Sequence, residues 1–200
     1  MKTIKFFIMM PEEKMEKNPH HLVLGELLDF ITGERRIDTH DERYRQKISK
    51  HLVQTLGHAK EDIQQNIVLT IAAGDQRASI RVDFLIDQAD KTCMLIKYAP
   101  GSLVTRRLSN LALSRVLLPY QIPVIVTTNG EDAEIINGLG KLIGQGLDSI
   151  PSKTNLEKLE ISESFPVISE RLHEKASRIA YAYEVDGACP CDTDVCLFDS

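Results

Sequence analysis

The chain has 200 residues, of which 42% are hydrophobic, which is enough for one sizeable core and an appended segment but not for two full domains. Its 24 basic and 29 acidic side chains give a net charge of -5, so bulk electrostatics would not hold it to nucleic acid and any DNA contact must be local. The apolar run near the N-terminus is too short for a secretory signal, and no stretch is long enough to span a membrane, so we expect a cytoplasmic protein without a membrane partner.

The first predicted element is a helix that follows an N-terminal arm of residues 1–38. Within the arm, the apolar residues 27–31 indicate one short strand that leads into a turn. Thr39 and Glu42 have the T-x-x-E spacing of a capping box, and Gly57 is a typical C-terminal stop, so we expect the helix between them. Its apolar positions recur every four residues, at Tyr44, Ile48, Leu52 and Leu56.

Three strands are predicted next. Residues 66–72 form a β-branched run, and residues 78–86 alternate between apolar and polar side chains, with Ile80, Val82 and Phe84 on one predicted face. A turn between the two runs indicates a hairpin. Residues 92–98 are continuously apolar in the middle, which favours a central strand.

The second half of the chain is predicted to alternate helix and strand. Residues 103–118 suit a helix packed on the sheet, and residues 123–128 suit a fourth strand. A crossover helix permits parallel pairing, so we expect an α/β fold with a mixed central sheet flanked by helices.

Residues 131–150 contain four glycines but no phosphate-binding glycine motif, so we favour a turn-rich surface connection over a nucleotide site. A C-terminal helix is predicted from Pro166 to about Tyr183. The expected organisation is an arm at 1–38, a core at 39–150, a C-terminal helical segment at 151–186 and a cysteine-containing tail at 187–200.

Four short motifs in residues 39–130 carry a family resemblance. They are Asp41-Glu42-Arg43-Tyr44-Arg45-Gln46, Arg81-Val82-Asp83-Phe84, Ala99-Pro100-Gly101 and Thr128-Asn129-Gly130. In this order and spacing they resemble the N-terminal nuclease domain of type I restriction enzyme R subunits, a member of the PD-(D/E)XK superfamily. The resemblance implies a restriction-endonuclease-like core in which helix, three strands, helix and strand follow one another.

The resemblance also implies metal-assisted DNA hydrolysis. Asp83 matches the strand aspartate that holds Mg²⁺, and Glu42 matches a supporting glutamate on the first helix. From the residues alone, Asp83 is either such a ligand or a solvent-facing strand residue. Glu42 is fully explained as a capping residue, which we favour over a metal role.

The E-x-K motif of the family is degenerate here. Its positions fall on Ile96, Lys97 and Tyr98, so both the glutamate and the lysine of the motif are replaced. Because strand side chains alternate, Lys97 points away from the expected site unless the strand slips by one residue. Lys97 otherwise pairs with a carboxylate, reaches an edge of the sheet or sits in a polar site.

Basic side chains could provide a local surface for DNA. The candidates for nucleic-acid binding are Arg43, Arg45, Arg106 and Arg107. Solvated helix faces, balanced by acidic residues, explain the same residues without any ligand. Separately, Cys189, Cys191 and Cys196 could supply three ligands to Zn²⁺ or an Fe-S cluster, although the usual C-x₂-C spacing is absent and a redox-sensitive tail is the simpler interpretation.

Three functions therefore remain. We prefer a catalytically degenerate nuclease-fold module that binds nucleic acid weakly. The alternatives are a Mg²⁺-dependent DNA endonuclease with a rearranged site, using Asp83, Glu42 and Lys97, and a protein-interaction subunit. A restriction motor does not fit in 200 residues, so a partner polypeptide would have to supply specificity or motor function.

Overall fold

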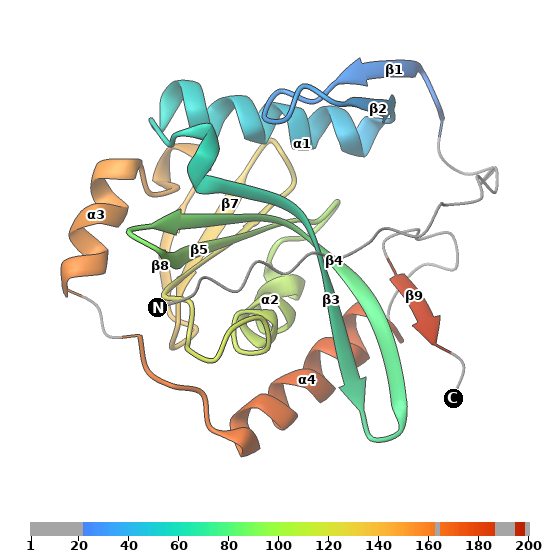
Figure 1. The fold of residues 1–200 in the computed structure, drawn as a ribbon, viewed down its shortest axis with the longest axis vertical. Coiled ribbons are helices and arrows are strands. Elements are labelled where there is room, and N and C mark those ends of the chain that lie inside the picture. The colour runs from blue at the N-terminus through green and yellow to red at the C-terminus, as the bar shows by residue number, and fades with distance from the viewer. Residues whose placement is uncertain (1–21, 163–164, 187–194, 199–200) are drawn as a thin grey trace.

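The computed structural model describes residues 22–162, 165–186 and 195–198, of which residues 159–162 and 195–198 are described by their backbone alone (Figure 1). The strands are β1 (Gly25–Leu28), β2 (Arg35–Asp38), β3 (Ile63–Ala73), β4 (Gln76–Gln88), β5 (Lys91–Tyr98), β6 (Val124–Thr128), β7 (Ala133–Asn137), β8 (Leu142–Gln145) and β9 (Val195–Phe198). The α-helices are α1 (His40–Lys50), α2 (Arg107–Leu113), α3 (Lys153–Ser162) and α4 (Glu170–Glu184).

The main sheet is mixed, as the sequence predicts. Its strand order is β3-β4-β5-β6-β7-β8, and β9 pairs with the β3–β4 hairpin along β4. Strands β5 and β6 are parallel, joined by the crossover through α2, and the other pairs in this order are antiparallel. Strands β1 and β2 form a separate antiparallel hairpin. The predicted α/β fold class is thus confirmed.

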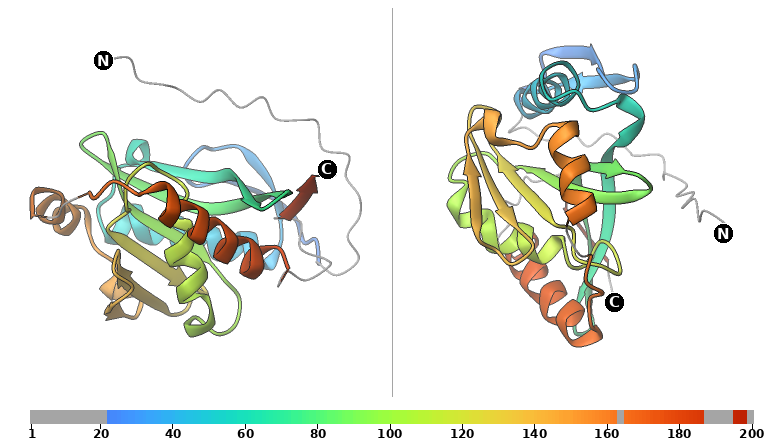
Figure 2. Two further views of the ribbon diagram at one scale, coloured as in Figure 1. Left: turned by 90° about the horizontal axis from the view of Figure 1, so that it is seen from below. Right: turned by 90° about the vertical axis from the view of Figure 1, so that its left-hand side faces the viewer.

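The helices cover both faces of the main sheet. Helix α1 lies over one face, and α2 and α4 lie beside each other over the opposite face (Figure 2). The α1-side core includes Ile48, Leu52, Phe84 and Ile96, all of which are buried. The α4-side core contains buried residues from the sheet and from both helices, among them Ile80, Leu95, Leu113 and Ala180.

The β3–β4 hairpin changes face partway along its length. Ile80 and Val82 belong to the α4-side core, whereas Phe84 belongs to the α1-side core, so the alternation shifts phase at Asp83. The register places Asn66 opposite Asp83, and Asn66 has a positive φ of 54°. Asparagine tolerates this left-handed conformation better than most residues. The two strands therefore bend together at this pair, and Asp83 is turned toward α1.

Helix α1 begins where the capping box predicts. The Thr39 side chain accepts a hydrogen bond from the Glu42 backbone N–H at 3.1 Å. The Glu42 carboxylate bonds to Gln46 instead of returning to Thr39. The helix continues as a π-helical turn over His51–Thr55 and ends before Gly57, whose φ is +76°.

Three predicted segments differ from the structure. Residues 131–150 are not merely a connection, because they form β7 and β8, and Ile135 and Ile136 are buried there. The helix predicted over 103–118 is confined to a 3-10 turn at Val104–Arg106 followed by α2. Helix α4 begins at Glu170, capped by the Ser169 side chain, so the predicted start at Pro166 was too early.

The segment predicted as an arm contains the β1–β2 hairpin, which packs beside α1. The strand expected at 27–31 overlaps β1 only at Leu27 and Leu28, because β1 ends at Leu28 and a turn follows. Among the described residues, no helix is long and apolar enough to cross a membrane.

Candidate functional site

The candidate site is centred on Asp83, which belongs to β4 and faces Arg45 of α1. Its side chain is only 2% exposed, so the solvent-facing interpretation was wrong. One carboxylate oxygen accepts a hydrogen bond from Arg45 Nε at 2.6 Å, and the other accepts one from the Tyr98 backbone N–H at 2.7 Å. Both oxygens of Asp83 are thus bound to partners within the chain, and its charge is balanced by the neighbouring guanidinium.

Tyr98 is the residue onto which the resemblance would place the lysine of the E-x-K motif. Its hydroxyl donates to Asp41 at 3.1 Å, and its ring stacks on Tyr44 with 5.9 Å between centroids. The Arg45 guanidinium lies 5.4 Å from the centre of the same ring. Burial and the nearby Asp41 carboxylate raise the pKa of Tyr98 above its usual value, so its hydroxyl stays protonated at neutral pH. This side chain cannot replace a lysine that orients or activates water.

Ile96 is the residue onto which the resemblance would place the metal-binding glutamate. It is fully buried in the α1-side core, opposite Phe84 in the register of β4 and β5. An aliphatic side chain offers no ligand to a cation. The strand therefore keeps the expected register, and no slip brings a carboxylate into the site.

The Thr128-Asn129-Gly130 motif follows β6 and packs against Tyr44 of α1. Gly130 has a φ of +85°, and a Cβ atom built there would lie 2.4 Å from Tyr44 Cδ1. The Thr128 hydroxyl accepts from the Gly130 N–H at 3.0 Å and donates to the Asp132 carbonyl at 2.7 Å. Glycine is required here because the turn approaches the Tyr44 ring closely, which explains one motif of the resemblance.

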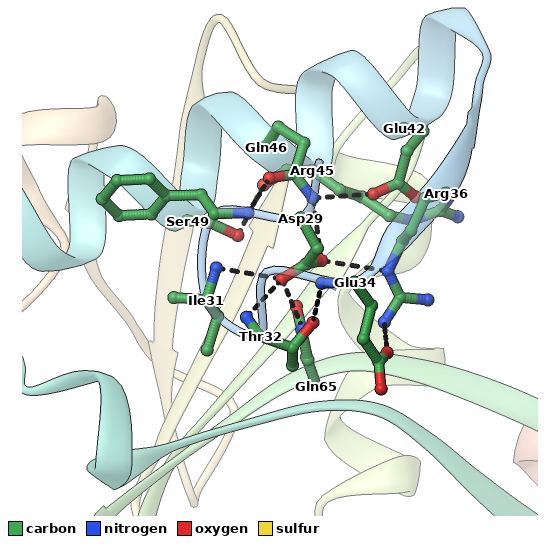
Figure 3. Close-up of polar contacts among 11 residues, drawn as sticks. Asp29, Ile31, Thr32, Glu34, Arg36, Glu42, Arg45, Gln46, Ser49 and Gln65 are labelled. Atoms are coloured by element: carbon green, nitrogen blue, oxygen red, sulfur yellow. Dashed lines mark hydrogen bonds and ion pairs between the residues drawn. The ribbon is translucent and has the colours of Figure 1, made fainter. Parts of the chain in front are cut away.

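Glu42 belongs to a different network from Asp83. Its carboxylate accepts from Gln46 Nε2 at 2.8 Å, and the same nitrogen donates to Asp29 at 2.9 Å. Asp29 is 2% exposed and also accepts from Gln65 of β3 and Arg36 of β2 (Figure 3). This network fastens the β1–β2 hairpin to α1 and β3.

The surroundings of Asp29 strongly favour its charged form. Burial alone would raise its pKa, but hydrogen bonds from the Thr32 backbone, Gln65 and Gln46, together with the charge of Arg36, lower the pKa to about 2. A buried carboxylate that is held charged by so many donors acts as a structural anchor. Glu42 extends this anchor instead of facing Asp83.

Lys97 lies on the opposite face of the sheet from Asp83. Its ammonium group donates to the Arg81 backbone carbonyl and lies 3.6 Å from the Glu184 carboxylate of α4. Glu184 in turn accepts from the Ser109 hydroxyl of α2. Lys97 thus pairs with a carboxylate, one of the structural alternatives, and the structure does not bring it together with Asp83.

The four candidate arginines have unequal freedom to meet a ligand. Arg43, on α1, bonds to both oxygens of Asp38 but keeps 56% of its side chain exposed. Arg45 is only 13% exposed and is committed to Asp83. Arg107 makes two hydrogen bonds to Glu134, each 2.6 Å long. Arg106 is half-buried at the start of α2.

The Asp83 site does not fit a resident Mg²⁺. A magnesium ion needs one or two free carboxylates with room for bound water, whereas both oxygens of Asp83 are occupied and a guanidinium lies beside them. The described residues contain no group of three or more His, Cys, Asp or Glu side chains suited to a metal. Cys189 and Cys191 lie outside the described residues, and the Cys196 side chain is not described, so the thiol site stays a prediction.

Sequence reasoning missed Arg45 as the partner of Asp83 and Asp41 as the partner of Tyr98. Both residues stand in the Asp41–Gln46 motif, one helical turn apart, so their shared helix face could have indicated a common target. That target lies far along the chain, on β4 and β5.

The comparisons with known proteins give one match. The family described as type I restriction enzyme R protein N terminus matches residues 40–151, which is more than half of the chain. The matched segment starts with the first residue of α1 and continues past β8, so it contains the whole Asp83 site. Neither a curated protein nor a solved structure matches the chain.

Proposed function

Because the chain belongs to the type I restriction enzyme R protein N-terminal family, we propose that it is a nuclease-fold module that binds DNA without hydrolysing it. The observation that carries the proposal is the closed state of the Asp83 site. The carboxylate that would hold a metal is bound by Arg45 and by the Tyr98 backbone, and Ile96 supplies no second ligand.

The binding surface that we propose is the outer stripe of α1. Arg43, Lys47 and Lys50 recur at i, i+4 and i+7 and are all exposed. Lys47 pairs with Glu131, but both side chains are largely exposed, and such surface pairs contribute only about 0–1 kcal/mol. Lys47 can therefore exchange its carboxylate for a DNA phosphate at little cost, whereas Arg43 keeps its bonds to the buried Asp38 and meets a phosphate through the exposed part of its guanidinium group.

The overall charge of -5 limits how strongly such a stripe can bind. A surface of about three cations would give weak binding with a shallow dependence on salt concentration. Sequence recognition or DNA movement would come from a partner polypeptide, as the restriction family suggests. The chain would then position DNA, and a partner polypeptide would carry out recognition or movement of the DNA.

The test combines cleavage and binding with the same purified protein. Supercoiled plasmid is incubated with Mg²⁺ or Mn²⁺, and binding of a labelled duplex is followed by fluorescence polarisation between about 50 and 200 mM salt. We expect no nicking and a weak, salt-dependent affinity that Arg43→Glu and Lys50→Glu both reduce. Lys141→Glu, on the exposed turn between β7 and β8, is the control with the same change of charge.

Two outcomes would contradict the proposal. Nicking by the wild type that is lost in Asp83→Asn would show that the site opens and binds metal, which would favour the endonuclease alternative. Equal DNA binding by the α1 variants, the control variant and the wild type would exclude the α1 stripe as the DNA surface.

A further inference from the structure

Helices α2 and α4 lie side by side over the face of the sheet opposite α1 (Figure 2). Side chains of these helices and Arg115 line a hollow between them. The two helices run antiparallel here, because Ser109 meets Glu184 at one end, whereas Arg115 and Leu172 line the same hollow at the other. Its apolar floor is formed by Leu108, Ala112, Leu172, Ala176 and Ile179.

The apolar floor continues to an exposed apolar rim. Leu108 is 46% exposed, and Val104, one turn earlier in the chain, is 57% exposed. Tyr183, four residues beyond Ile179 on α4, is 40% exposed. Exposed apolar side chains beside an apolar hollow are typical of a binding surface. On α4 the apolar residues Leu172, Ala176, Ile179 and Tyr183 recur at i, i+4, i+7 and i+11, so this apolar row follows one side of the helix.

Cations border this apolar row. Arg115 and Lys175 line the hollow itself. Arg171 and Arg178 are exposed and lie four residues before and three residues after Lys175, so the three form one stripe along α4. Within the described part of the chain, none of these three makes an ion pair, although the chain as a whole carries a net charge of -5. The exposed carboxylates of α4 are Glu170 and Glu174, so the three exposed cations outnumber them, and the helix edge with these cations favours an acidic ligand.

The size of the hollow limits what can enter it. Its volume is about 110 Å³, smaller than the roughly 150 Å³ cavity that accepts a benzene molecule and well below the 300 Å³ or more of a cofactor site. One branched aliphatic side chain fits, but a nucleotide does not. DNA would use the cations, but its sugar-phosphate backbone has no protruding branched aliphatic group to fill the floor.

We propose that this α2–α4 groove docks an acidic amphipathic helix of a partner polypeptide. An aliphatic side chain of the partner enters the hollow beside Leu108 and Ile179, and its carboxylates meet Arg171, Lys175 and Arg178. This is the helix-in-groove mode, in which apolar anchors at i, i+3, i+4 and i+7 provide affinity and charges provide register. The inference does not rest on the proposed function of the Asp83 site, which lies on the other face of the sheet.

The experiment uses a fluorescein-labelled synthetic helix with leucines at i, i+3, i+4 and i+7 and glutamates between them, together with the full chain. Polarisation is measured for the wild type, Leu108→Ser and Lys175→Glu. Both variants are expected to weaken peptide binding about tenfold, because each removes part of a central contact. Val68→Ser on β3 and Lys141→Glu are matched controls at exposed positions and should change binding less than about twofold.

A labelled DNA duplex is measured in parallel. Loss of duplex binding in Lys175→Glu, without any effect of Leu108→Ser on the peptide, would overturn the proposal and identify a nucleic-acid surface instead. Absence of peptide binding by the wild type at low salt would also overturn it. Neither result depends on whether the protein cleaves plasmid, so the two proposals fail separately.

Discussion

Replacing Arg45 by methionine is expected to destabilise the protein by about 3–5 kcal/mol, the usual cost of leaving a buried charge without its partner. Asp83 is 2% exposed, and the side chain of Arg45 is 13% exposed, so water cannot solvate the carboxylate that remains. Methionine has a similar length and a similar helix propensity, so α1 and its packing are preserved. The lost stability then reports the unpaired charge of Asp83 together with the lost contact between the guanidinium and the Tyr98 ring.

A second substitution separates charge from packing. Asp83→Asn removes the charge but keeps an oxygen that can accept from the Tyr98 backbone N–H. In the Arg45→Met background it should recover most of the lost stability, giving a coupling energy of about 2–3 kcal/mol between the two sites. Lys47→Met removes one partner of the exposed pair with Glu131 and should cost less than about 1 kcal/mol.

Urea denaturation at neutral pH, followed by circular dichroism, gives the free energy of unfolding for the wild type and these variants. The reasoning is refuted if Arg45→Met and Lys47→Met cost the same. It is also refuted if adding Asp83→Asn to Arg45→Met lowers the stability further, since the carboxylate would then not be the source of the penalty.

Three further predictions concern the framework of the site. The pKa of Asp29 falls from 3.8 in the unfolded chain to about 2 in the folded one. The ionised carboxylate therefore contributes about 2 kcal/mol of stability above pH 4, and this contribution is lost as the pH falls from about 4 to 2. The stability advantage of the wild type over Asp29→Asn, measured by urea denaturation, should shrink over that pH range. At the bend, Asn66→Gly should be nearly neutral in thermal denaturation, whereas Asn66→Val should cost about 1–2 kcal/mol, and equal costs would mean that the positive φ is unimportant. Gly130→Ala should destabilise by at least about 1 kcal/mol, since the added methyl group meets Tyr44, and the cost should fall in a Tyr44→Leu background.

Helix α1 and strands β4 and β5 could be predicted because their signals are local. The capping box at Thr39, the alternation in residues 78–86 and the apolar run at 92–98 each lie in one short segment, and each corresponds to an observed element. Strands β7 and β8 were missed for the same local reason. Gly138, Gly140, Gly144 and Gly146 suggested turns, while β7 is buried on both faces and so shows no alternation of apolar and polar residues.

The site could be predicted only in part because its geometry depends on pairs that are distant in the chain. The motifs pointed to Asp83, and the resemblance placed Ile96 and Tyr98 where the glutamate and lysine of the E-x-K motif are expected. They could not show that the phase of β4 shifts at Asp83, because Ile80, Val82 and Phe84 follow one uninterrupted alternation in the sequence. The shift coincides with the positive φ of Asn66 on the neighbouring strand. The partner of Asp83 likewise comes from α1, 38 residues earlier.

The sharing of strands between the two cores also determines how the molecule opens. Strands β4, β5 and β6 each contribute side chains to both cores, so neither core can lose its packing while the other remains intact. Amide hydrogens of these strands should therefore exchange only through global unfolding, at one common and slow rate. The β1–β2 hairpin is fastened largely through Asp29, and its amides should exchange faster, by local detachment from an otherwise native sheet.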